Sequence, residues 1–137
     1  VMLGLGHGFW TAMQVFVDKM VEEGYVSDGD KRLYTVTNSV DEAVSSVLGF
    51  YRNFHSIRWV GERLVVRMQR GPTDEQLAAV SAEFASATVD GRGVSSTGPL
   101  DQEVAERDHL DLARVVLRLN RRAPGKLRLL IDAVNTW

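Results

Sequence analysis

The residues best suited to bind a ligand form a short basic stretch towards the end of the sequence. Its cations are Arg118, Arg121, Arg122, Lys126 and Arg128. Pro124 suits the first position of a helix, and anions bind readily at a helix N-terminus. We therefore predict a site for a phosphate or a carboxylate, formed by four of these side chains: Arg118, Arg121, Arg122 and Lys126. The alternative is a solvated charged face that pairs with the acidic segment 101–111.

The other reactive side chains show no spacing that predicts catalysis or metal binding. The histidines, His7, His55 and His109, lack the H-x-x-x-H spacing of metal ligands, although His7 could cap a helix or line a pocket. Cysteine is absent, which excludes disulfides, thiolate zinc sites and a cysteine nucleophile. No G-x-S-x-G nucleophile elbow occurs. We therefore predict no catalytic residue, no metal and no cofactor within this sequence.

Glycines at positions 4, 6 and 8 follow an apolar run, at the place where α/β proteins bind phosphates. Their spacing is G-x-G-x-G, whereas dinucleotide-binding turns have G-x-G-x-x-G. We interpret the segment as a flexible turn between a strand and a helix.

Residues 1–54 read as strand, helix, strand, helix, which predicts parallel strands with right-handed crossovers. The apolar run Val1–Leu5 predicts a strand buried on both faces, so we infer the C-terminal piece of something larger, or a processed chain. An edge strand with a trimmed start is the alternative. Gly24 predicts the end of the first helix. A strand follows at 33–36, and a capping box of Ser39 with Glu42 should begin the second helix.

Residues 55–137 predict a different, ferredoxin-like α+β domain. Two strands, 57–60 and 63–69, should form a hairpin at Gly61-Glu62, and Thr73 with Gln76 should cap the next helix. A loose strand is expected at 93–100, an exposed acidic connection at 101–111, a strand at 114–119 and a last helix after Pro124. From Arg63 onwards this order is β-α-β-β-α. The uncovered face of the sheet should carry outward-pointing arginines, among them Arg67, Arg114 and Arg118.

The composition excludes several classes of partner. The 137 residues carry a net charge of −2, which provides no electrostatic footprint for nucleic acid or an anionic membrane. The apolar runs are too short to span a bilayer. We therefore expect a cytoplasmic α/β protein.

Three stretches resemble the C-terminal part of the LOG family: Gly6-His7-Gly8-Phe9-Trp10, residues 20–27 and residues 36–44. Phe50 to Ser56 and the following hairpin are similar to a longer bacterial subgroup with an extra C-terminal domain. These Rossmann-like proteins, often labelled possible lysine decarboxylases, hydrolyse the N-glycosidic bond of nucleoside 5′-monophosphates. Their signature, P-G-G-x-G-T-x-x-E, matches no stretch of this sequence, so the resemblance transfers no catalytic residue.

The resemblance implies a fragment of a nucleotide phosphoribohydrolase that is inactive alone. Residues 1–54 would end the Rossmann-like nucleotide-binding domain, and residues 55–137 would form the ferredoxin-like, ACT-like domain. Expected partners are a nucleoside monophosphate or another small ligand and a second copy in a homodimer. The alternatives are a regulatory module that binds a small ligand and a dimerisation domain without catalysis.

Overall fold

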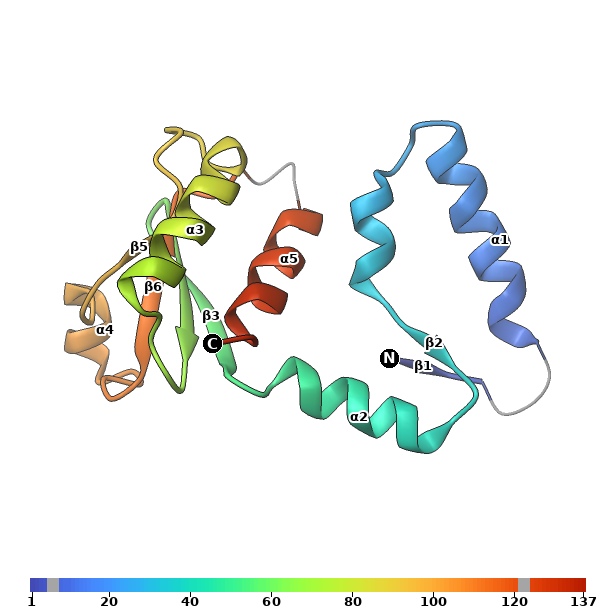
Figure 1. The fold of residues 1–137 in the computed structure, drawn as a ribbon, viewed down its shortest axis with the longest axis horizontal. Helices are drawn as coiled ribbons and strands as arrows, with labels where there is room; N and C mark the ends of the chain where they lie inside the picture. The colour runs from blue at the N-terminus through green and yellow to red at the C-terminus, as the bar shows by residue number, and fades with distance from the viewer. Residues whose placement is uncertain (5–7, 121–123) are drawn as a thin grey trace. The chain divides into compact units, whose positions relative to one another are not determined.

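The computed structural model describes residues 1–4, 8–120 and 124–137 and divides into two compact units, Val1–Phe50 and Tyr51–Trp137 (Figure 1). Both units mix helices and strands. The first contains a two-stranded parallel sheet, and the second contains a four-stranded antiparallel sheet.

The first unit has the predicted strand–helix–strand–helix order. Its elements are β1 (Met2–Leu3), α1 (Phe9–Glu22), the 3₁₀ helix η1 (Asp28–Leu33), β2 (Val36–Thr37) and α2 (Val40–Phe50). β1 pairs in parallel with β2 through Met2↔Val36 and Leu3↔Thr37, which confirms the parallel pairing. Gly24 follows α1 with a φ of 76°, and the Tyr25 amide donates to the Met20 carbonyl at 2.9 Å, so the predicted glycine stop is confirmed.

Two local predictions for the first unit need correction. The strand expected at 33–36 starts only at Val36, because Asp30 accepts from both the amide and the hydroxyl of Ser27 and thereby begins η1. The Ser39 capping box is half formed: Ser39 Oγ accepts from the Glu42 amide at 3.3 Å. The Glu42 carboxylate instead accepts from the Thr37 hydroxyl, whose oxygen also accepts the Ser39 amide.

The apolar side chains of the first unit stay largely uncovered. Among its described residues only Thr37 is buried, whereas Val1 is 53% and Leu3 is 38% exposed. Within the described residues β2 is the single hydrogen-bonded neighbour of β1, so the burial predicted for both faces of this strand is not reached in the described part of the chain. The apolar stripes of α1 and α2 are exposed as well, at Phe9, Val15, Phe16, Val40, Val44, Val47 and Leu48.

The second unit begins with the predicted hairpin. β3 (Phe54–Val60) pairs with β4 (Arg63–Met68), and Gly61 takes a φ of 59° in the turn. There follow α3 (Asp74–Phe84), the 3₁₀ helix η2 (Ala85–Ala87), β5 (Ser95–Ser96), α4 (Asp101–Glu106), β6 (Ala113–Leu117) and α5 (Pro124–Val134). The sheet order is β3-β4-β6-β5. The strand expected at 93–100 is therefore shorter than predicted.

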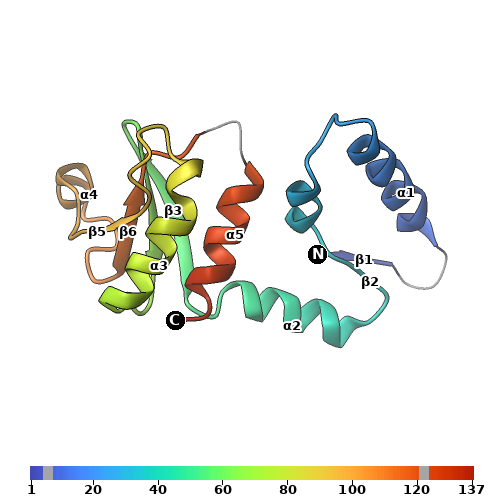
Figure 2. The same cartoon turned by 45° about the horizontal axis from the view of Figure 1, so that its top comes forward.

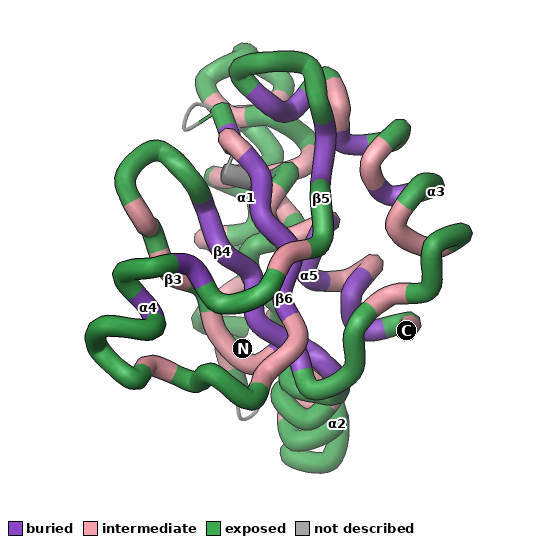
Figure 3. Tube along the Cα trace, turned by 90° about the vertical axis from the view of Figure 1, so that its left-hand side faces the viewer, coloured by how far each residue is buried: buried purple, intermediate pink, exposed green. Residues whose placement is uncertain are grey.

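The core of the second unit lies between its sheet and two helices. α3 and α5 cover one face, and α4 lies on the other side (Figures 1 and 2). The Thr73–Gln76 capping box is confirmed in both directions, at 2.8 and 3.2 Å. β4 is buried from Leu64 to Met68, and β6 is buried from Arg114 to Leu117 (Figure 3). The apolar side chains of this core include Leu64, Val66, Met68, Phe84, Val115, Leu130, Ile131 and Val134.

Candidate functional site

The sheet face opposite α3 and α5 carries most of the charged side chains that the fold brings together. Cross-strand pairing sets Arg67 opposite Arg114 and Val65 opposite Val116, and β3 adds Arg58 opposite Val65. Residues paired in this way share one face of an antiparallel sheet. We call it the arginine face. The prediction that Arg67 and Arg114 share a face is confirmed, but their exposure was predicted wrongly, because only 3% and 1% of their surfaces are accessible.

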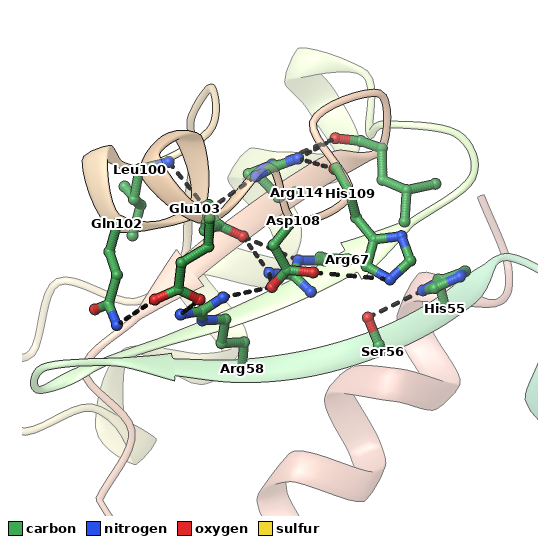
Figure 4. Close-up of polar contacts among 12 residues, drawn as sticks. His55, Ser56, Arg58, Arg67, Leu100, Gln102, Glu103, Asp108, His109 and Arg114 are labelled. Carbon is green, nitrogen blue, oxygen red and sulfur yellow. Dashed lines mark hydrogen bonds and ion pairs between the residues drawn. The ribbon is translucent and has the colours of Figure 1, made fainter.

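Glu103 on α4 is the ion-pair partner that both buried arginines share (Figure 4). Its Oε1 accepts from Arg67 Nε at 2.9 Å and Nη2 at 2.6 Å. Its Oε2 accepts from the Leu100 amide at 3.0 Å and lies 2.8 Å from Arg114 Nη1. Arg114 Nη2 donates to the carbonyls of His109 and Leu112. The segment 101–111 is mostly exposed, as its acidic composition predicted, but α4 within it turns Glu103 towards the sheet and supplies a counter-charge that the buried arginines need.

Burial shapes the titration of Glu103. Its side chain is fully inaccessible, and burial alone would raise its pKa. The Leu100 amide and the guanidinium groups of Arg67 and Arg114 stabilise the carboxylate more strongly, so the pKa of Glu103 is lowered below its usual range. The carboxylate is thus held ionised and has no proton to offer as a general acid near neutral pH.

A second layer of ion pairs surrounds this buried group at the protein surface. Arg58 binds the carboxylates of Glu106 and Asp108, and Arg67 Nη2 also lies 2.7 Å from Asp108. The guanidinium of Arg58, followed by that of Arg67, lowers the pKa of Asp108. Gln102 and then Arg58 lower the pKa of Glu106. These contacts attach the C-terminal end of α4 and its following loop to β3 and β4.

Two histidines lie at the rim of the cluster. The rings of His55 and His109 meet edge to face at 4.6 Å between centroids, and His109 Nε2 lies 3.8 Å from Asp108. His55 Nδ1 lies 3.0 Å from the hydroxyl of Ser56, its neighbour on β3. A serine activated by histidine also needs a carboxylate that orients the ring. Within residues 8–120 and 124–137, no carboxylate forms an ion pair with His55, so this contact does not constitute a Ser-His-Asp site.

The pH dependence of stability follows from these pKa directions. Folding lowers the pKa values of Glu103, Glu106 and Asp108, so they stabilise the folded unit above their ordinary titration range. This contribution is lost as pH falls through the lowered values. We expect a lower urea midpoint at about pH 3 than at about pH 6. A Glu103→Gln variant should have a flatter pH profile, and identical profiles would contradict a contribution from Glu103.

The residues predicted to bind an anion do not come together in the described part of the chain. Arg118 follows β6 and pairs with Glu62, and its Nη1 lies 3.9 Å from Asp90. Lys126 is exposed on α5, which covers the opposite face of the sheet (Figure 2). Arg121, Arg122 and His7 lie outside the described residues.

Glu103 was the residue that sequence reasoning missed. A usable signal was present, because Arg67 and Arg114 alternate with valines on strands predicted to lie in one sheet. Buried guanidinium groups require an acidic partner, and 101–111 was the nearest acidic segment. Which of its carboxylates turns inward depends on the position of α4.

The described residues contain no group of three or more potential metal ligands, and none of their helices has the length and hydropathy to cross a bilayer. Neither known protein families, nor curated proteins, nor solved structures show a significant match to this chain.

Proposed function

We propose that this chain is the C-terminal part of a LOG-like hydrolase of nucleoside 5′-monophosphates. The first unit would supply the last βαβα of a Rossmann-like sheet, and the second would be a ferredoxin-like, ACT-like domain. The family resemblance of residues 6–10, 20–27 and 36–44 supports this proposal. The parallel pairing of β1 with β2, on either side of α1, is compatible with it.

The observation that carries the proposal is the unburied apolar surface of the first unit. Parallel strands are normally enclosed by helices and by further strands. Among the residues that the structure describes, β1 and β2 pair only with each other, and Phe9 is 74%, Phe16 is 63% and Leu48 is 68% exposed. So many exposed large apolar side chains on two helices favour a contact with other protein elements. Further strands and helices of a Rossmann-like domain would cover it and would carry the catalytic P-G-G-x-G-T-x-x-E motif.

The strand order of the second unit is compatible with a ferredoxin-like domain. β4, α3 and β5 form a crossover in which β6 lies between the two strands, antiparallel to both. This is the arrangement of a split βαβ unit. β3 takes the free edge beside β4.

The first test is enzymatic. The purified 137-residue chain should release no ribose 5-phosphate from AMP above a protein-free control, because it has no match to the family's catalytic motif. A polypeptide from the same reading frame that includes that motif should release it. Release by the 137-residue chain, or a reading frame without the motif upstream of Val1, would contradict the proposal.

The second candidate function is a regulatory module that binds a small ligand without catalysis. The specific observation in its favour is an open basic pocket in the second unit, lined by Arg63, Arg92 and Arg118. Homodimerisation is compatible with either candidate, because the exposed apolar stripes of the first unit offer a surface for association.

A further inference from the structure

A pocket of about 430 Å³ lies on the arginine face, at the end remote from the buried pair of Arg67 and Arg114. Arg63 and Arg67 are four positions apart on β4, so their Cα atoms are separated by roughly 13 Å along the strand. Side chains from separate segments line the pocket: Arg63, Asp90, Arg92, Ser95, Val116 and Arg118. Its volume is in the range of sites for small molecules.

The charge of the lining favours an anion. Three guanidinium groups and the single carboxylate of Asp90 leave two net positive charges, in a chain whose net charge is −2. Arg63 and Arg92 are exposed and form no ion pair with any residue that the structure describes. The pocket therefore differs from the other end of the same face, where Glu103 neutralises the arginines.

The loop that carries Arg92 and Ser95 is fixed to α3. Ser81 Oγ accepts from the Val94 amide at 3.1 Å and lies 3.3 Å from the Arg92 carbonyl, to which it donates. Gly93 has a φ of 71°, and a Cβ there would lie 2.1 Å from the Ser81 carbonyl oxygen, so this position requires glycine. Its amide donates to Thr88 Oγ1 at 3.2 Å. A loop held in this way keeps the wall of the pocket in place before a ligand arrives.

We propose that this pocket binds the phosphate group of a small phosphorylated molecule. A phosphate monoester carries a charge near −2, which matches the two net positive charges of the lining. Arg63 and Arg92 can each donate two parallel hydrogen bonds to phosphate oxygens, and the Ser95 hydroxyl adds a neutral donor. Val116 provides an apolar contact for the organic part of the ligand. The inference deepens the second candidate function and is independent of the LOG-like proposal.

Calorimetric titration of the whole chain at low ionic strength tests the inference. The probes are inorganic phosphate, ribose 5-phosphate and AMP, with ribose, adenosine and free amino acids as phosphate-free counterparts. We expect heat from the phosphate esters and none from ribose or adenosine, and the affinity should fall as salt is added. Inorganic phosphate shows whether the phosphate group alone is sufficient for binding, and AMP shows whether a base adds affinity.

Variants locate the site. The double variant Arg63→Gln/Arg92→Gln should bind ribose 5-phosphate at least about tenfold more weakly, because it loses two charge-assisted contacts. Both side chains are exposed, so the fold should persist, which circular dichroism checks. Glu62→Gln should strengthen binding about twofold or more by releasing Arg118. Lys126→Gln, which removes an exposed cation on α5, should leave the affinity unchanged.

The possible outcomes distinguish a failure of the phosphate site from a failure of the binding-module function on which it rests. Absence of heat with every phosphate compound, or unchanged affinity in the double variant, would overturn the phosphate site. Heat with amino acids alone would overturn it too but would leave the binding-module function standing. Weakened binding in Lys126→Gln would place the phosphate on the other side of the sheet and would also overturn the inference.

Discussion

Replacing Glu103 by glutamine should lower the free energy of unfolding of the second unit by about 3–5 kcal/mol. The substitution keeps the size of the side chain but removes the charge that neutralises Arg67 and Arg114, which are 3% and 1% exposed. Two guanidinium groups would then stay buried with less than their full counter-charge. Urea denaturation followed by circular dichroism and by the fluorescence of Trp59 on β3 measures the change.

Glu106→Gln is the matched control for this prediction. Glu106 lies on the same helix and pairs with Arg58, but its side chain is 49% exposed. Surface ion pairs of this kind contribute about 1 kcal/mol or less, so the midpoint should hardly move. Equal losses in Glu103→Gln and Glu106→Gln would contradict the special role of the buried carboxylate.

A triple variant separates the charge from the packing. Arg67→Met, Glu103→Leu and Arg114→Met together replace the buried ions by apolar side chains of similar size. Because desolvation of buried ions offsets most of their attraction, this variant should recover much of the stability lost in Glu103→Gln. A triple variant less stable than Glu103→Gln would show that the hydrogen bonds from Arg114 to the carbonyls of His109 and Leu112 matter more than the charges.

Asn53→Ala should be the second strongly destabilising substitution, with a cost of about 3 kcal/mol. Asn53 is fully buried where the chain enters β3. Its Nδ2 donates to the carbonyls of Arg70 and Val134, each at 3.0 Å, and its Oδ1 accepts from the Arg70 amide at 2.8 Å. Truncation leaves these backbone groups without their partner, and each loss costs about 1 kcal/mol or more.

Asn135, the residue that follows α5, forms a second set of hydrogen bonds at this junction. Asn135 Oδ1 accepts from the amides of Asn53 and Phe54 at 2.8 and 2.9 Å. The two asparagines thus join the beginning of β3 and the end of β4 to the C-terminal end of α5. Gln69→Ala, at an exposed position directly after β4, is the control and should change stability by less than about 0.5 kcal/mol. A cost for Asn53→Ala no larger than this control would refute the role of the junction.

Features that depend on neighbouring residues were readable from the sequence. The Thr73–Gln76 capping box, the glycine turn at Gly61 and the stop at Gly24 all appear as predicted. Each involves contacts within a few positions, or a φ that glycine alone adopts readily. Local contacts also explain why the strand predicted at 33–36 was misplaced. The hydrogen bonds between Ser27 and Asp30 begin a 3₁₀ helix that includes Leu33, although the segment is rich in residues that favour strands.

The candidate site was predictable only in part. Alternation along β4 and β6 correctly placed Arg67 and Arg114 on one face, because successive side chains of a strand point to opposite sides. Alternation carries no information about what covers that face. The acidic composition of segment 101–111 predicted a solvated connection. Composition alone does not show which carboxylate of the segment lies beside an arginine instead of in water.

The sequence by itself therefore determined the strand–helix–strand–helix order of the first unit, the Thr73–Gln76 capping box and the shared face of Arg67 and Arg114, because these follow from backbone geometry and short-range hydrogen bonds. Only the tertiary structure decided that Glu103 accepts hydrogen bonds from Arg67, which lies 36 positions away in the sequence. It also decided that Asn135 accepts the amide of Asn53, which lies 82 positions away. It also decided that Arg63, Arg92 and Arg118 share one pocket. Such pairings form only when the packing of helices on the sheet excludes water, which makes an unpartnered charge or amide costly.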